Sequence, residues 1–233
     1  DSPLSSGTIE VKYMTAREED ILTSTNLIEK GVVIDRLLES VIADPKIKLD
    51  DLLIGDKNAL MVGTRVLGYG ADYTIKIEDP DTSLEVEHTF DLTKLETTKP
   101  DEKLFKNGNK FEFTLPTSKR TIEFKLLTHK DERELDAEIE GYKKVQAVGG
   151  VSRELTTRLK KQIISIDGET DKSKINDFVD NQFLAKDTRE YRAYLKEITP
   201  DVIFEQEYIS QIGEPHKVNI PVGVRFFWPE SSL

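Results

Sequence analysis

The sequence predicts an α+β fold in which helical bundle segments are combined with antiparallel β-hairpins. Apolar and polar residues alternate over residues 73–77 and again over 84–90, and the polar turn between them suits a tight reversal. Residues 203–222 repeat this layout near the C-terminus. Between the hairpins and before them, apolar residues recur at helical spacing, as over 33–42.

The 233 residues suffice for one large domain or two small ones. We expect five regions along the chain. They are an extended N-terminal arm (1–14), an N-terminal helical region (15–71), paired hairpins (72–92 and 202–222), a strand pair followed by a helical region (110–201) and an aromatic C-terminal strip (223–233).

Capping residues set the expected helix starts. Thr15 and Glu18 form a capping box, and this interpretation is favoured over an acidic metal or catalytic cluster. Further helices are expected over 57–69 after Asp56, 129–145 after Thr128, 153–165 after Ser152, 175–183 after Asp171, and from Asp187 onward. Strands are expected over 110–115 and 121–127, and Gly149-Gly150 indicates a turn between helices rather than a hinge.

Composition narrows the function classes. The formal net charge is −11, which argues against general binding of nucleic acids or anionic membranes and favours a basic protein partner. The chain has no Cys, so disulfides, thiolate metal sites and Cys nucleophiles are excluded. No apolar window is long enough for a membrane span, and no signal peptide is visible after Asp1.

No constellation of catalytic residues stands out. His88 and His216 lie on the return strands of the two hairpins, and solvated histidines are favoured over a shared site. Asp79 and its acidic neighbours resemble a calcium loop only loosely, so turn chemistry is the better interpretation. Basic residues lie along one helix, where a solvated face is the default, at Arg153, Arg158, Lys160 and Lys161.

The two terminal segments are candidates for partner binding. The C-terminal strip places Arg225 beside Phe226, Phe227 and Trp228, and three adjacent aromatic side chains cannot all be buried by one strand. Packing of these rings in the core is favoured, and contact with a partner is the alternative. The N-terminal arm adds the alternating side chains of Ile9, Val11 and Tyr13.

Several strings, in their order and spacing, resemble the T4-type bacteriophage base plate protein family. They are YMTAREEDILTS, LLIGDKNALMVGTRVLGYGADY, FEFTLPTSKRTIEFKLLTHKDE, ELTTRLKKQIISIDG, LAKDTREYRAYLKEITPDV and IPVGVRFFWPE. The resemblance extends from about Gly7 to Glu230. It implies a protein of the tail baseplate hub or of its assembly.

This sequence differs from the family pattern at the positions of the metal ligands. Members often carry paired Cys in both hairpins, like a split zinc ribbon. The matching positions here are Asp79, Thr82, Ile209 and Ile212, and none is Cys or His. We therefore expect a metal-free, zinc-ribbon-like pair of hairpins that lie side by side, with Ile209 and Ile212 as the apolar filler between them.

The function implied is that of a non-enzymatic phage tail protein without a cofactor. It would be a baseplate hub component or hub assembly factor that contacts other tail or baseplate proteins, in the virion or in the host cytoplasm during assembly. No nucleic-acid or membrane partner is expected. The alternatives are a tail assembly chaperone absent from the mature virion, and a hydrolase that uses carboxylates.

Overall fold

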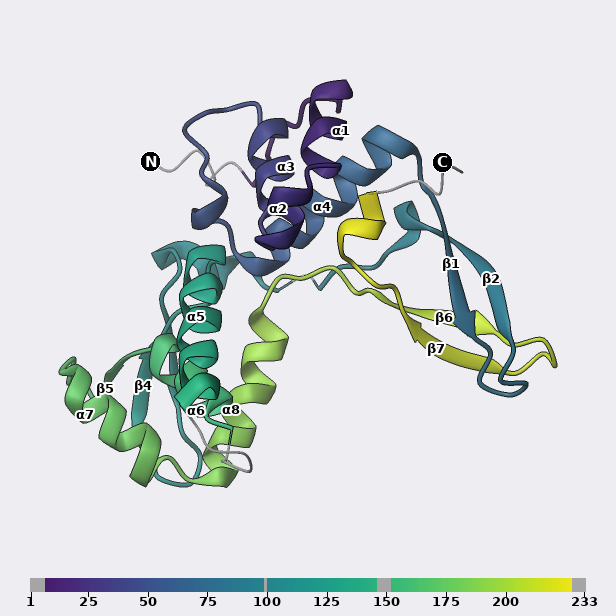
Figure 1. Cartoon of the computed structure of the whole chain (residues 1–233). Coiled ribbons are helices and arrows are strands. Elements are labelled where there is room, and N and C mark those ends of the chain that lie inside the picture. Colours follow the sequence, from purple (N-terminus) through teal and green to yellow (C-terminus); the bar gives the residue numbers. More distant parts are fainter. Residues whose placement is uncertain (1–6, 99, 146–151, 228–233) are drawn as a thin grey trace. The chain divides into compact units, whose positions relative to one another are not determined.

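The computed structural model describes residues 7–98, 100–145 and 152–227. The fold is α+β, as predicted, and the named strands in these residues all pair antiparallel. Two compact units are present (Figure 1). The helix–hairpin unit contains Asp1–Leu49, Gly55–Thr97 and Asp201–Leu233, and the sheet–helix unit contains Asp50–Ile54 and Thr98–Pro200. The predicted turn at Gly149-Gly150 lies outside the described residues.

Four helices form the first part of the helix–hairpin unit. They are α1 (Ala16–Leu22), α2 (Thr25–Glu29), α3 (Val33–Val41) and α4 (Ile54–Tyr69). The capping box is confirmed, because the Thr15 N–H donates to the Glu18 carboxylate at 2.9 Å and the Thr15 hydroxyl caps the first turn. Asp56 does not cap α4 as predicted. The helix begins at Ile54, two residues before Asp56. Asp56 therefore lies in the first turn, where its negative charge still suits the helix dipole.

Part of the N-terminal arm is paired with the end of α3. The Lys12 N–H donates to the Val41 carbonyl at 2.8 Å, and the Ala43 N–H donates to the Glu10 carbonyl at 3.0 Å. Val11 and Ile42 form the bridge between these two hydrogen bonds. Residues 10–12 are therefore tied to the helical layer rather than held away from it.

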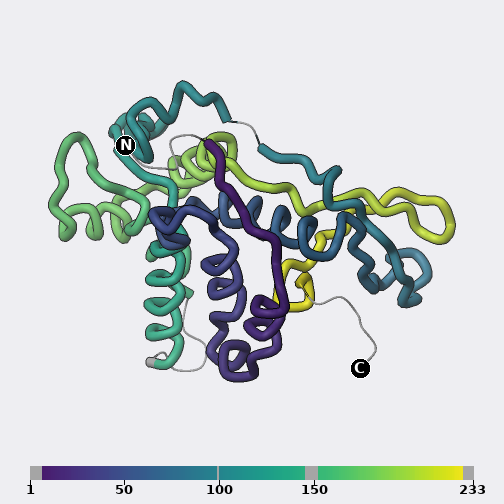
Figure 2. The backbone as a smooth tube through the Cα atoms, turned by 90° about the horizontal axis from the view of Figure 1, so that it is seen from above, coloured from purple at the N-terminus to yellow at the C-terminus, as the bar shows by residue number. Residues whose placement is uncertain are grey.

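Both predicted hairpins are confirmed. Strands β1 (Asp72–Glu78) and β2 (Glu85–Asp91) form the first, and β6 (Glu205–Ile209) and β7 (Pro215–Asn219) form the second. The hairpins extend in the same direction from the helices of their unit (Figures 1 and 2). The base of the first hairpin is fixed by the buried Arg65 of α4, whose guanidinium donates to the Gly70 and Asp72 carbonyls at 2.8 and 3.2 Å.

The C-terminal aromatic residues pack in the core at this base. Val224–Phe227 is a 3₁₀ turn, not a strand, and it turns both Phe226 and Phe227 inward until neither is exposed to solvent. The Phe226 ring meets the Tyr73 ring edge-on at 5.0 Å between centroids. Buried rings cannot also contact a partner, so for Phe226 and Phe227 core packing replaces the partner-binding alternative. Trp228 lies outside the described residues.

The sheet–helix unit is built on a three-stranded sheet with the order β3 (Phe111–Thr114), β4 (Thr121–Phe124), β5 (Ile163–Ile166). The third strand corrects the predicted helix over 153–165. Helix α6 (Glu154–Gln162) ends at Gln162, and the isoleucine-rich run that follows pairs with β4. β-branched residues favour the pleated conformation when a partner strand is available.

Helices α5 (His129–Val145), α6, α7 (Lys172–Asp177) and α8 (Ala185–Ile198) complete this unit. A π-helical turn, Phe178–Gln182, continues α7 and shortens the predicted helix there. The core centres on Phe124, which is fully buried and meets the Tyr191 ring edge-on at 5.0 Å. Asp187, also fully buried, accepts hydrogen bonds from the Thr117 and Ser118 N–H groups and thereby fixes the β3–β4 turn.

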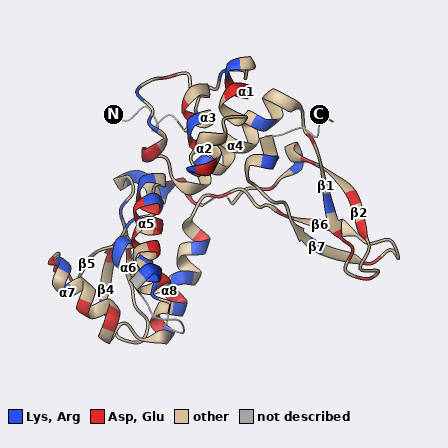
Figure 3. Cartoon of the chain, in the orientation of Figure 1, with Lys and Arg blue, Asp and Glu red and all other residues tan. Residues whose placement is uncertain are grey.

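The basic face of α6 is neutralised within the chain. Arg158 pairs with Glu132 and Lys161 with Glu134, both on α5, and Lys160 pairs with Asp180 at 2.7 Å. Figure 3 shows the acidic residues along α5 and the basic residues along α6. These three basic side chains are therefore partly exposed and ion-paired to acidic residues of α5 and of the Phe178–Gln182 turn.

We predict that Phe124→Ala destabilises the protein by about 3–5 kcal/mol, because it leaves a cavity in a close-packed aromatic core. Urea unfolding followed by circular dichroism measures this change. The exposed Glu112→Ala on the adjacent strand is the control and should stay within about 0.5 kcal/mol of wild type. Equal losses for the two variants would contradict the assigned core.

Candidate functional site: the junction of the two hairpins

The two hairpins meet at the carboxylate of Asp79, which lies in the β1–β2 turn and is fully buried. Its Oδ2 accepts hydrogen bonds from the Tyr208 hydroxyl at 2.7 Å and from the Gln211 N–H at 2.9 Å, both in the second hairpin. Its Oδ1 accepts from the N–H groups of Asp81 and Thr82 and from the Thr82 hydroxyl, at 2.9 to 3.0 Å. One side chain therefore organises its own turn and binds the other hairpin.

Further contacts close the junction on either side. His216 of β7 hydrogen-bonds the Asp81 carboxylate through Nε2 at 2.8 Å. The His88 ring of β2 meets the Tyr208 ring edge-on at 5.1 Å. Both histidines therefore contact the junction, but with different partners, and they do not share a site.

The four positions that match the family's metal ligands divide into two groups. Asp79 and Thr82 lie in the junction and hydrogen-bond each other. Ile209 and Ile212 face solvent, with 52% and 65% of their surface exposed, so the prediction that they fill the space between the hairpins is wrong. Side chains alternate along a strand, and it is Tyr208 and Ser210, the neighbours of Ile209, that point inward.

The hydrogen bonds control the charge state of the junction. Burial alone would raise the pKa of Asp79, but the donors from Gln211, Tyr208 and Thr82 outweigh it and hold the pKa well below its usual range. The side chains of Ser210 and His216 likewise lower the pKa of Asp81. Both carboxylates are therefore ionised at neutral pH, and each charge is offset by donors from the opposite hairpin.

A metal ion has no evident place among the described residues. No group of three or more His, Asp and Glu side chains there has an arrangement that could hold one. The oxygens of Asp79 point at hydroxyl and N–H donors, which already supply the positive partner that a cation would provide. The chemistry of this junction is hydrogen bonding between two turns.

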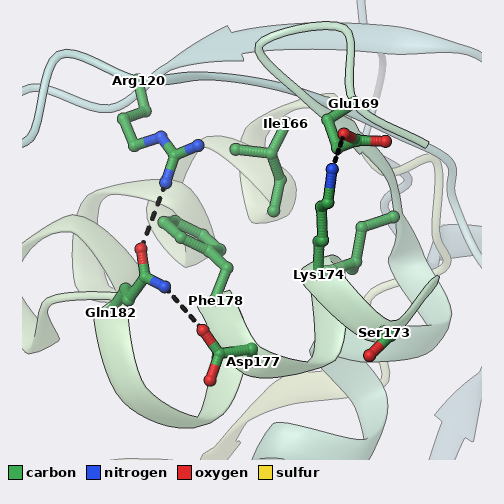
Figure 4. Close-up of a pocket in the computed structure, with 9 residues that line it drawn as sticks. Arg120, Ile166, Glu169, Ser173, Lys174, Asp177, Phe178 and Gln182 are labelled. Carbon is green, nitrogen blue, oxygen red and sulfur yellow. Dashed lines mark hydrogen bonds and ion pairs between the residues drawn. The ribbon is translucent and has the colours of Figure 1, made fainter. Parts of the chain in front are cut away.

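The sheet–helix unit contains a pocket of about 420 Å³ that the sequence did not indicate. Its polar side chains bind one another: Arg120 donates to Gln182 at 3.3 Å, Gln182 donates to Asp177 at 2.7 Å, and Lys174 pairs with Glu169 (Figure 4). A catalytic acid or base must be available to a substrate. These groups are engaged with each other.

The remaining candidate residues for partner binding are spread over the helix–hairpin unit. Tyr13 is 72% exposed, and Arg225 is exposed beside two buried rings. Ile9 and Val11 are half-buried in the arm. The structure does not gather them into one cluster with the junction, so each stays a separate proposal.

Asp79→Asn should loosen the junction, because an amide replaces one acceptor oxygen by a donor and removes the negative charge that strengthens the hydrogen bonds. We expect faster amide hydrogen exchange at Thr82 and Gln211, measured by NMR. Asp72→Asn, at the exposed start of β1, is the matched control. Unchanged exchange at Gln211 in the Asp79 variant would show that the carboxylate does not hold the hairpins together.

The junction should also weaken in acid. The folded-state pKa of Asp79 and that of Asp81 lie below the unfolded value of about 3.9, so their contribution is fully present above that pH and is lost as the pH falls through the folded values. Amide shifts of Gln211 and Gly213 followed from pH 7 to pH 2 would report this. A transition already complete above about pH 5 would contradict the assignment to these carboxylates.

Comparisons with known proteins give one family. No curated protein sequence and no solved structure matches the chain. A family model described as T4 bacteriophage base plate protein matches residues 2–208, which is most of the chain and includes the Asp79 turn and the strand that carries Tyr208. The match extends through both units and confirms the resemblance seen in the sequence, so the chain belongs to the T4 bacteriophage base plate protein family.

Proposed function

We propose that this protein acts in the phage tail baseplate as a hub component or a hub assembly factor, through contacts with other tail proteins and without enzymatic activity. Membership in the base plate family is the observation that carries the proposal. Membership in this family makes the chain a baseplate-related phage protein. The position at the hub and the mode of action are the proposed part.

The arrangement of polar side chains supports a role in binding rather than in catalysis. The buried carboxylates Asp79 and Asp187 are saturated by donors from other segments, and each fixes a turn. A hydrolase that uses carboxylates needs two of them beside an open pocket, with pKa values set apart for acid and base roles. In the described pocket the carboxylates of Glu169 and Asp177 are bound by Lys174 and Gln182 instead.

The surface chemistry supports protein partners. No helix in the described part of the chain has both the length and the apolar character that a membrane crossing requires. The net charge of −11 disfavours contact with the phosphate backbone of nucleic acids. A charged surface of this kind attracts proteins of opposite charge and speeds their association.

Deleting the gene from the phage that carries it should stop baseplate assembly, and infected cells should accumulate incomplete tail intermediates visible by electron microscopy. Supplying the protein from a plasmid should restore complete tails. Complete, infectious particles in the absence of the protein would contradict the proposal.

Mass spectrometry of purified wild-type particles then separates the two forms of the proposal. A hub component is present in the virion, and an assembly factor or chaperone is absent from it.

A further inference from the structure

Three large aliphatic side chains are exposed at the turn ends of the two hairpins, and we call them the hairpin tip. Leu84 and Ile212 lie in the turns, and Ile209 is the last residue of β6. The exposed fractions of Leu84, Ile209 and Ile212 are 58%, 52% and 65%. Among the described residues, ten large hydrophobic side chains are exposed, and three of them lie in or directly beside these two short turns. Turns normally carry Gly, Pro, Asn, Asp and Ser, so turn formation does not explain the aliphatic side chains of Leu84 and Ile212.

The backbone contacts hold the hairpin tip in one place. Asp79 accepts from Gln211, which lies between Ile209 and Ile212, and its own N–H donates to the Leu84 carbonyl at 2.8 Å. The same aspartate therefore connects the two segments that carry the three aliphatic residues. A surface ordered before binding loses less conformational entropy when a partner docks on it.

The hairpins around the tip are strongly acidic. Residues 72–91 and 205–219 contain ten Asp or Glu residues against two Lys, a formal charge of −8 out of −11 for the chain. Both Lys are neutralised within the hairpins, because Lys76 pairs with Glu85 at 3.2 Å and Lys217 with Glu205 at 2.6 Å. Exposed carboxylates near the tip that have no ion pair to another described residue include those of Glu78 and Glu214.

The basic residues of α6 do not neutralise the acidic hairpins. Arg158, Lys160 and Lys161 are paired with acidic residues of their own unit. The acidic surplus of the chain is therefore concentrated on the hairpins, in the same segments as the exposed aliphatic side chains. Exposed apolar patches with a polar border mark protein contact sites.

We propose that the hairpin tip docks on a protein partner whose surface presents an apolar patch bordered by Lys and Arg. This proposal rests on the proposed function, because it names the chemistry of the partner in the baseplate. A second copy of the chain is a poor occupant, since it would bring a charge of −8 against a charge of −8. The partner's basic border instead meets Glu78 and Glu214, while its apolar patch covers Leu84, Ile209 and Ile212.

The test uses the full-length protein and the purified baseplate proteins of the same phage, each immobilised in turn. The tip variant combines Leu84→Ser, Ile209→Ser and Ile212→Ser. The control variant combines Leu104→Ser, Leu155→Ser and Leu184→Ser, which are similarly exposed but lie in the other unit. Circular dichroism first establishes that both variants are folded, as expected for substitutions of exposed side chains.

We expect wild type and control to bind one baseplate protein with equal affinity, and the tip variant to bind it at least about tenfold more weakly. Glu78→Lys with Glu214→Lys should weaken the same complex, and raising the salt concentration should slow association. A photo-crosslinker placed at Ile212 should mark a partner surface where aliphatic residues lie beside Lys or Arg.

Undiminished binding by the tip variant would overturn the docking proposal but leave the proposed function standing, since another surface would then make the contact. Failure of wild type to bind any baseplate protein would contradict the proposed function as well. A wild-type dimer that the tip substitutions dissociate, or adsorption of the tip to lipid vesicles, would replace the proposed partner by a second copy or by a membrane.

Discussion

A single buried carboxylate determines how the two hairpins are held together. Asp79 is saturated by donors that come from its own turn and from a hairpin more than a hundred residues away in the sequence. An ionised group with so little contact with water is stable only when its hydrogen bonds are complete. The same requirement fixes the positions of Tyr208 and Gln211, and through them the second turn.

This constraint has a consequence for the surface. Tyr208 and Ser210 point inward, so the alternation of the strand directs Ile209 outward, and the tight turn after Ser210 leaves Ile212 in solvent. The hairpins then carry most of the net charge and an aliphatic tip together. The sheet–helix unit differs, because its charged helices α5 and α6 neutralise each other. The charged residues of the two units therefore differ in role. On the hairpins we propose that they contact a partner, whereas in the sheet–helix unit they pair α5 with α6.

Local sequence rules predicted a large part of the fold and a smaller part of the site. The Thr15 capping box, α3 and both hairpins depend on neighbouring residues, and the structure confirms them. Ile163–Ile166 fits a helical and an extended pattern equally, and only its pairing with β4 makes it a strand. Asp79 has the sequence context of an ordinary turn residue. Its bond to Tyr208 is a tertiary contact that no local pattern reveals.

The most direct test of this account is a double-mutant cycle of Asp79→Asn and Tyr208→Phe, measured by equilibrium unfolding. If the carboxylate and the hydroxyl join the hairpins as described, the loss of stability in the double variant will be clearly smaller than the sum of the two single losses. Strictly additive losses would show that the two groups act independently, and would contradict the junction on which the exposed tip depends.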